Sequence, residues 1–294
     1  MASIALNATT ITNTKPMKEL FDMISRKSSK MTTVVYSTSF SLGIRFFSKR
    51  FHDPIYGIYG FVRFADEIVD SFHGYDKEKL LNRFTEDTFT AIEEKISLNP
   101  ILNNFQYVVN KYGIERKLIE LFLRSMKMDL DKVTYDQKGY EEYILGSAEV
   151  VGLMCLRVFS EGDSDKYNKL KQPAMRLGSA FQKINFLRDL KADVKGLGRS
   201  YFPGIDMTEF DEAMKKNIET DIEKDFEEGL AGIRKLPSGA RFGVYVAYAY
   251  FHSLLKKIKR ASAERLLSER IRISNGTKYW LLINCYLKHK FNRI

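Results

Sequence analysis

Two groups of acidic side chains carry the clearest chemical signal in this chain of 294 residues. Asp66 and Asp70 stand four residues apart in the first group, and Asp189 and Asp193 stand four residues apart in the second. In a helix such residues share a face, where like charges destabilise the helix by about 0.2–0.5 kcal/mol. A bound cation offsets this repulsion. Carboxylate oxygens suit Mg²⁺, which leaves positions for water and substrate phosphate.

The surroundings of the second group strengthen this interpretation. Gln182, Asn185, Asp189 and Asp193 follow one another at spacings of three, four and four residues, so they line one face of a helix. That face is too polar for a core stripe. If the two acidic faces converge, they form a metal site at which bound ions, rather than a proton donor, neutralise a departing diphosphate.

The first group has a second reading. Arg63 lies one turn before Asp66 and can hold the carboxylates in place or grip a phosphate. Taken alone, the pattern also fits a solvated helix end with an ordinary Arg–Asp ion pair. The presence of the second acidic group favours the metal–diphosphate site.

The charge of the chain is unevenly distributed. The net charge is +10, but the segment from Arg234 to the end has 14 Lys/Arg and 2 Asp/Glu, a net +12, and the remainder carries −2. A basic segment favours nucleic acid, anionic lipid or a small polyanion, or is simply a solvated face. We find no nucleic-acid recognition motif, P-loop, GxSxG or dinucleotide fingerprint. Cys155 and Cys285 form no CxxC pair, which fits a reducing cytoplasm.

Helical periodicity dominates the pattern, and alternating strand patterns are scarce. Residues 1–16 contain no secretory signal and are expected to be a disordered tail or an extended start. No apolar run reaches the roughly 18 residues typical of a membrane span. Asp53-Pro54 and Pro173 are interpreted as helix starts, and only residues 37–42 and 150–152 leave strand as an alternative. We expect one all-α domain over residues 17–294. The helices predicted are 55–70, 77–96, 139–159, 173–193, 208–234 and 241–260.

At these residues the chain resembles the squalene/phytoene synthase family, the head-to-head trans-prenyltransferases. The resemblance covers about Tyr36 to Lys278. Its anchors are the segments 36–40, Arg63 with Asp66 and Asp70, 150–154, Gln182 with Asn185, Arg188-Asp189 and Asp193, 199–203, and Glu269-Arg270. The segments 150–154 and 199–203 look more like bacterial phytoene synthases than squalene synthases.

The resemblance implies the all-helical isoprenoid synthase fold, with helices around a central apolar cavity capped by the acidic motifs. It implies Mg²⁺, with Mn²⁺ as an alternative, bound by Asp66, Asp70, Asn185, Asp189 and Asp193. It implies substrate contacts from Tyr36, Ser37, Ser39, Phe40, Tyr59, Arg63, Gln182, Arg188 and Arg270. Catalytic roles fall to the four aspartates, Tyr201 and Tyr250. Many members carry Tyr where this chain has Leu145, so that role passes to Tyr143, Tyr201 or Tyr250, or to no residue.

The implied reaction is phytoene synthesis: two geranylgeranyl diphosphates condense through a cyclopropyl (prephytoene) diphosphate, in carotenoid biosynthesis. That reaction needs no NADPH. The alternatives are squalene or dehydrosqualene synthesis from two farnesyl diphosphates, and a non-catalytic helical assembly protein. We expect no nucleic-acid partner. We expect a cytoplasmic protein whose basic C-terminal region can rest on the inner face of the cell membrane.

Overall fold

The computed structural model describes residues 17–131, 134–196, 201–203 and 210–291, without the side chains of 38–39, 131, 192–196 and 275. The described residues form helices and contain no β-strand. In chain order the helices are α1 Met17–Tyr36, α2 Thr38–Ile44, α3 Lys49–Ser71, α4 Lys77–Glu94, α5 Pro100–Tyr112, α6 Arg116–Asp131, α7 Gln137–Ile144, η1 Leu145–Glu149, α8 Val150–Ser160, α9 Ser164–Gly196, α10 Glu212–Lys235, α11 Ser238–Lys259, α12 Ala263–Ser268 and α13 Asn275–Lys290. The predicted all-α class is therefore confirmed.

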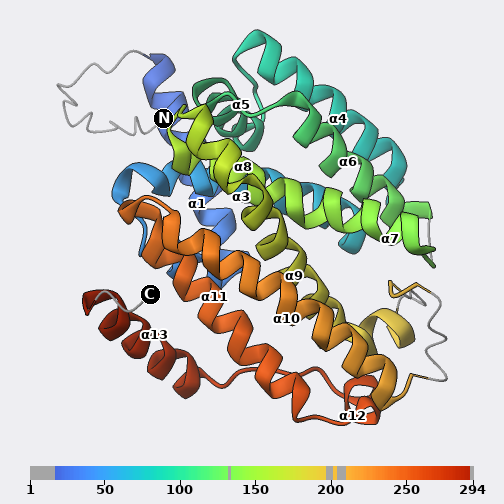
Figure 1. The fold of residues 1–294 in the computed structure, drawn as a ribbon. Helices are drawn as coiled ribbons and strands as arrows, with labels where there is room; N and C mark the ends of the chain where they lie inside the picture. The colour runs from blue at the N-terminus through green and yellow to red at the C-terminus, as the bar shows by residue number, and fades with distance from the viewer. Residues whose placement is uncertain (1–16, 132–133, 197–200, 204–209, 292–294) are drawn as a thin grey trace, which may run out of the picture.

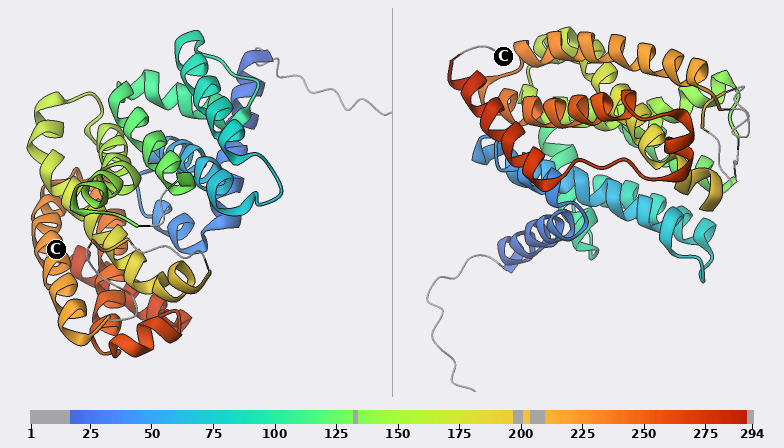
Figure 2. Two further views of the ribbon diagram at one scale, coloured as in Figure 1. Left: turned by 90° about the vertical axis from the view of Figure 1, so that its right-hand side faces the viewer. Right: turned by 90° about the horizontal axis from the view of Figure 1, so that it is seen from below.

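The helices form two packed groups (Figure 1). In that view α4, α5 and α6 lie at the top, α10, α11 and α13 lie at the bottom, and α3, α8 and α9 run between them. One apolar core joins α3, α4, α5, α6 and α8, and a second joins α9, α10, α11 and α12. Figure 2 shows α13 on the outside of the molecule, where it packs against α11.

Helix α3 carries the first acidic group and is anchored by its apolar face. Phe51, Ile55, Ile58 and Phe61 recur at spacings of three and four residues and are fully buried. The Phe61 ring stacks on Phe105 of α5 with 3.9 Å between ring centroids. This packing fixes the rotation of α3 about its axis, and it therefore fixes the direction in which the acidic group at its C-terminal end points.

Two predicted helix starts are wrong. Helix α3 begins at Lys49, so Pro54 lies inside it, and α9 begins at Ser164, so Pro173 lies inside it. Both prolines are tolerated because tertiary packing stabilises the helix on either side of the lost N–H. At Pro173, helix α10 supplies Gly232, where an added Cβ would lie 2.3 Å from the proline Cβ.

The predicted helix 139–159 is a continuous helical segment, but its middle is the π-helical turn η1. Gly146 in this turn touches α6: an added Cβ would lie 2.6 Å from the carbonyl oxygen of Leu121. Residues 37–42 and 150–152, for which strand was an alternative, belong to helices α2 and α8 or to the cap of α2. The predicted tail 1–16 lies outside the described residues.

One helical segment of the described chain, Gln137–Ser160, is long and apolar enough to cross a membrane by length and composition alone. This finding corrects the expectation from the sequence that no segment is long and apolar enough to span a membrane. A little over half of its apolar window, 56%, is buried inside the molecule. A core helix passes the same test, and this segment packs between α6 and α9 as a core helix does.

Candidate active site

A cavity of about 790 Å³ lies between the two helix groups. That volume is within the range of about 300–1,000 Å³ usual for small-molecule sites. The lining residues come from eight helices, α1, α2, α3, α6, α7, α9, α11 and α13, and from the segments that join them. They are Tyr36, Ser37, Phe40, Leu42, Gly43, Ile44, Phe47, Tyr59, Arg63, Asp66, Asp70, Asp129, Tyr143, Gln182, Asn185, Phe186, Arg188, Asp189, Tyr201, Gly243, Val246, Ala247, Tyr250, Phe251, Arg270, Lys278, Leu281, Leu282 and Cys285.

This cavity brings together the two acidic groups, which are more than 100 residues apart in sequence. All of the predicted site residues line it except two, Ser39 and Asp193. The side chains of those two lie outside the described part of the chain. The folded chain therefore brings the other predicted metal ligands and substrate contacts to one cavity.

On the α3 side, Arg63 organises the carboxylates. Its Nη1 donates to Asp66 Oδ2 at 2.5 Å, and its Nη2 donates to Glu67. Burial, reinforced by the neighbouring Asp70, raises the pKa of Asp66 to about 6 against the pull of Arg63. The ion pair with Arg63 thus does not fully offset the cost of burying the ionised Asp66 carboxylate beside Asp70.

Aromatic side chains from α1, α2 and α3 form the wall beside Arg63. The Arg63 guanidinium lies 4.4 Å from the centre of the Tyr36 ring, and the Tyr59 ring stacks on Phe40 at 4.9 Å. Ser37 caps α2 by accepting a hydrogen bond from the backbone N–H of Phe40 at 3.2 Å. This cap fixes the N-terminal end of α2, which lines the same cavity as Asp66.

On the α9 side, two arginines hold Asp189. Arg188 Nε donates to Asp189 Oδ1 at 3.1 Å, and Arg270, 81 residues away in sequence, contacts the same oxygen at 2.6 Å. Asn185 Nδ2 donates to Gln182 Oε1 at 3.4 Å. The result is a band of alternating positive and negative charge across one end of the cavity.

A buried carboxylate that sequence reasoning missed lies deeper in the cavity. Asp129 of α6 accepts hydrogen bonds from the hydroxyls of Tyr143 at 2.8 Å and Tyr201 at 3.5 Å. Burial and the Asp129 charge hold the pKa of Tyr143 well above its usual range, so this phenol stays protonated. Phe186 stacks on Tyr201 at 4.2 Å. Tyr143 and Tyr201 lie here, and the substituted position Leu145 lies in the adjoining π turn.

The remaining walls are apolar. Helix α2 contributes Phe40, Leu42 and Ile44, helix α11 contributes Val246, Ala247 and Phe251, and helix α13 contributes Leu281, Leu282 and Cys285. Tyr250 lies between the charged and the apolar walls, with Lys278 Nζ 5.8 Å from the centre of its ring. Such a site has a charged end suited to a polyanion and an apolar remainder suited to hydrocarbon.

The donor set fits a divalent metal. Asn185 Oδ1 is buried without a hydrogen-bond partner, and so is the Arg63 Nε donor, both among described residues. The Asn185 oxygen is of the type that hard cations prefer, and the Arg63 N–H is of the type that donates to anionic oxygens. Within the described residues no group of three or more His, Cys, Asp or Glu is close enough to hold a metal alone. An ion bound here would need oxygen ligands in addition to these carboxylates.

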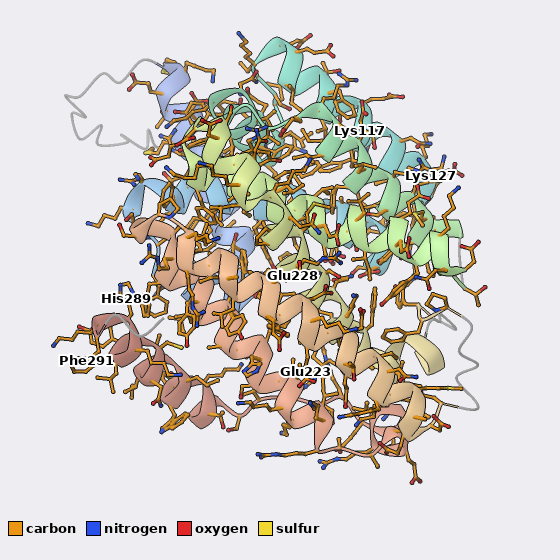
Figure 3. The ribbon with its side chains drawn as sticks, viewed as in Figure 1. Lys117, Lys127, Glu223, Glu228, His289 and Phe291 are labelled. Atoms are coloured by element: carbon orange, nitrogen blue, oxygen red, sulfur yellow. The ribbon has the colours of Figure 1, made fainter. Side chains whose placement is uncertain are left out.

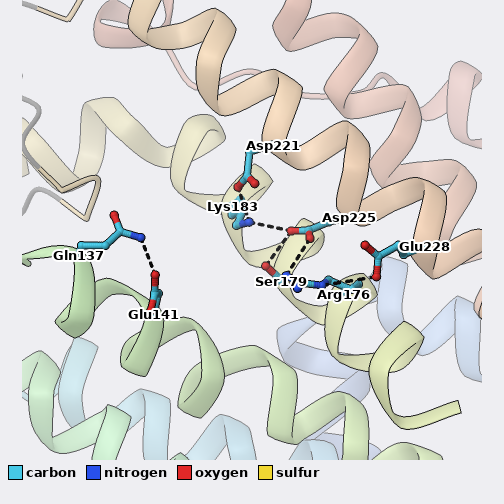
Figure 4. A network of polar contacts seen from close by, with 8 residues as sticks. All are labelled: Gln137, Glu141, Arg176, Ser179, Lys183, Asp221, Asp225 and Glu228. Carbon is cyan, nitrogen blue, oxygen red and sulfur yellow. Dashed lines mark hydrogen bonds and ion pairs between the residues drawn. The ribbon is translucent and has the colours of Figure 1, made fainter. Parts of the chain in front are cut away.

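A polar network behind the cavity holds α9 against α10 (Figure 4). Lys183, on the far side of α9 from Asn185, contacts Asp221 and lies 2.7 Å from Asp225 Oδ2. Ser179 donates to the same Asp225 oxygen at 2.8 Å. Because Lys183 and Asp225 are both buried, their pairing stabilises one position of α9 relative to α10.

Comparison with known proteins places the chain in a family. The sequence model of the squalene/phytoene synthase family matches residues 33–277. Phytoene synthase 1 (chloroplastic) of Solanum lycopersicum is 27% identical over 281 residues, which cover 86% of this chain and 65% of that protein. Presqualene diphosphate synthase of Rhodopseudomonas palustris is 27% identical over 172 residues, 58% of this chain and 60% of that protein. The matches thus span less than two thirds of the length of these relatives.

Solved structures share the fold. A dehydrosqualene synthase crystallised with a ligand superimposes with a TM-score of 0.80 at 22% identity, over 94% of this chain and 99% of that one. A squalene synthase from Alicyclobacillus acidocaldarius gives 0.72 at 19% identity, over 82% and 95%. These likenesses show the all-α isoprenoid synthase fold. Since the family model matches well over half of a chain that also has this fold, the chain belongs to the squalene/phytoene synthase family.

Proposed function

We propose that this protein is a Mg²⁺-dependent phytoene synthase that joins two geranylgeranyl diphosphates head to head. Members of its family are head-to-head synthases of the prenyltransferase type. The observation that supports the proposal best is the division of one cavity into a charged end and apolar walls. That division matches a substrate with a diphosphate head and a hydrocarbon chain.

The charged end would bind and ionise the substrate. Asp66, Asp70, Asn185, Asp189 and Asp193 would hold the metal. When bound, Mg²⁺ supplies Lewis-acid stabilisation of the departing diphosphate. Around these ligands, Ser37, Ser39, Arg63, Arg188 and Arg270 would contact the diphosphate oxygens. The orphan Nε of Arg63 would gain an acceptor, and Arg270 would exchange part of its contact with Asp189 for a substrate oxygen.

The apolar part would protect the cationic steps. The allylic cation left by the first substrate is attacked by the double bond of the second, and proton loss closes a cyclopropane ring. The rings of Phe40 and Tyr250 present faces that stabilise positive charge. The walls from α2, α11 and α13 exclude water that would quench the cation. Tyr143 and Tyr201, fixed by Asp129, would orient the chain beside the charged end.

A second candidate is squalene-type synthesis from two farnesyl diphosphates. One matched relative is named presqualene diphosphate synthase, and the solved structures with this fold include squalene and dehydrosqualene synthases. Both reactions use the same charged end. They differ in the length of hydrocarbon that the apolar walls must accept, and squalene synthesis also consumes NADPH.

A product assay tests the proposal. Purified protein is incubated with Mg²⁺ and either geranylgeranyl or farnesyl diphosphate, with and without NADPH, and the hydrocarbon is identified by mass. We expect a forty-carbon product without NADPH. A thirty-carbon product would contradict phytoene synthesis. It would indicate dehydrosqualene synthesis if it forms without NADPH, and squalene synthesis if it requires NADPH.

Removal of single carboxylates tests the site itself. We expect Asp66→Ala and Asp189→Ala each to lower turnover by about a thousand-fold or more while leaving the folded state intact, because each removes charge that holds the metal. Asp87→Ala, on the exposed face of α4, is the matched control and should keep full activity. Unimpaired turnover in both cavity variants would contradict the metal–diphosphate site.

A further inference from the structure

Large apolar side chains face solvent along the outer side of α13. Tyr279 is 68% exposed, Trp280 63%, Ile283 58% and Tyr286 55%. Figure 3 shows Phe291, just beyond the helix, pointing away from the rest of the molecule. These five side chains are called the outer face of α13 below. A contiguous exposed apolar face of this kind usually marks a site of contact with another protein or a membrane.

The opposite side of the same helix is already in use. Leu281, Leu282 and Cys285 line the cavity, and α13 packs on α11. Apolar side chains therefore lie on two sides of α13, whereas a surface helix usually has a single apolar face. Here one side is covered by the protein, and the other side is left to be covered by something else.

The charge around the outer face indicates what covers it. Residues 270–294 contain six Lys/Arg and no Asp/Glu, and Lys288 and Lys290 at the end of α13 are exposed. Each lysine near an anionic bilayer contributes about 1 kcal/mol to binding. Aromatic side chains combined with lysines are the composition of helices that lie in the interface between water and lipid.

We propose that the outer face of α13 docks this protein on an anionic membrane, with the helix lying in the headgroup layer. This inference goes beyond the proposed function, because docking would hold for a prenyl substrate of either length. The wall that α13 forms would then separate the cavity from the bilayer by one helix. Phe40 and Leu42, which line the cavity from α2, are also partly exposed, at 39% each.

The chain carries its own probe for this surface, since Trp280 is its single tryptophan. Full-length protein is excited at a wavelength selective for tryptophan and titrated with vesicles of phosphatidylcholine alone or with 30% phosphatidylglycerol. We expect a blue shift of the emission and quenching by brominated lipid with the anionic vesicles, and a much smaller response with the neutral ones. An unchanged spectrum with saturating anionic vesicles would overturn the proposal.

Paired variants assign the effect to this helix. Tyr279→Ser/Ile283→Ser should weaken vesicle binding at least about ten-fold, and Lys288→Gln/Lys290→Gln should weaken it about 30-fold. The matched controls are Leu98→Ser, an exposed leucine between α4 and α5, and Lys117→Gln/Lys127→Gln on α6 (Figure 3). Controls that lose binding as strongly as the α13 variants would overturn the assignment.

Two further measurements separate this proposal from its rivals. All variants should retain turnover of detergent-solubilised prenyl diphosphate, so a catalytic failure and a docking failure are distinguishable. A blue shift that grows with protein concentration in the absence of vesicles, together with dimers in sedimentation, would mean that a second copy covers the outer face. That result would overturn membrane docking.

Discussion

At the scale of residues, the two acidic groups are neutralised in different ways. Asp189 lies between two guanidinium groups, Arg188 and Arg270. Asp66 has one, on Arg63, which it shares with Glu67, and its pKa is raised to about 6. A cation bound between the groups would lower that pKa by favouring the ionised form. We therefore expect a bound cation to stabilise Asp66 more than Asp189.

Glu149, behind the cavity, gives a prediction for pH. Burial, reinforced by Asp225 and opposed by Arg176 and Lys183, raises the pKa of Glu149 to about 7 from 4.5. Its contribution to stability is complete below pH 4.5 and is lost as the pH rises through 7, because the folded state then holds a buried charge. We expect Glu149→Gln to be more stable than the parent above pH 7, by on the order of 1–3 kcal/mol.

Urea denaturation at pH 4.5 and pH 8.5 measures this difference. The gain should be near zero at the lower pH, where both side chains are neutral, and complete at the higher. An equal gain at both values would show that it comes from packing and not from ionisation of Glu149.

Site residues that stand at a regular helical spacing could be predicted from the sequence, and isolated site residues could not. Asp66 and Asp70 could be found because a spacing of four on a helix has a physical meaning whatever the tertiary fold. Asp129 has no such companion, and only the fold brings Tyr143 and Tyr201 to it. Arg270 was found through the family resemblance alone, since its contact with Asp189 spans 81 residues.

At the scale of elements, helices were predictable and their starts were not. Apolar periodicity located the helices because each buries one face. Because proline is favoured in the first helical turn, the sequence predicts helix starts at Pro54 and Pro173. Whether a neighbouring helix can compensate for proline in a helix interior depends on contacts such as Gly232 against Pro173, which no local pattern contains. The π turn η1 was missed for the same reason.

The contact of η1 with α6 gives a prediction for stability and turnover. Gly146→Ala would place a methyl group 2.6 Å from both the Leu121 carbonyl oxygen and Ser125 Cβ, so the two helices must separate. We expect a loss of about 1–3 kcal/mol in stability. We also expect lower turnover, because α6 carries Asp129 and α7 carries its partner Tyr143.

Gly276→Ala is the control for this change, since an added Cβ there has no neighbour within 4 Å. It should leave stability and turnover near the parent values. Thermal melts and steady-state rates of the two variants test this prediction. Equal stability and equal turnover would mean that α6 shifts to accommodate the methyl group with no loss of free energy.

At the scale of the whole molecule, the apolar walls limit the length of a hydrocarbon chain that fits in the cavity. Ala247 of α11 lines the cavity and is small. We expect Ala247→Phe to lower kcat/KM for geranylgeranyl diphosphate about ten-fold more than for farnesyl diphosphate, because the larger side chain removes space for the longer chain. Inhibition by inorganic pyrophosphate should be unchanged. An equal loss for both substrates would mean that Ala247 does not lie beside the chain end.

Helix α9 has a consequence for how this protein can change over time. Its 33 residues extend about 50 Å, with Asn185 and Asp189 on the cavity side and Lys183 bound to α10 on the other. A substitution that shifts the α10-facing side of this helix also moves Asn185 and Asp189 on its cavity side. If the cavity is under selection, residues outside it are constrained too, and we expect Lys183 to be replaced in relatives as rarely as Asp189.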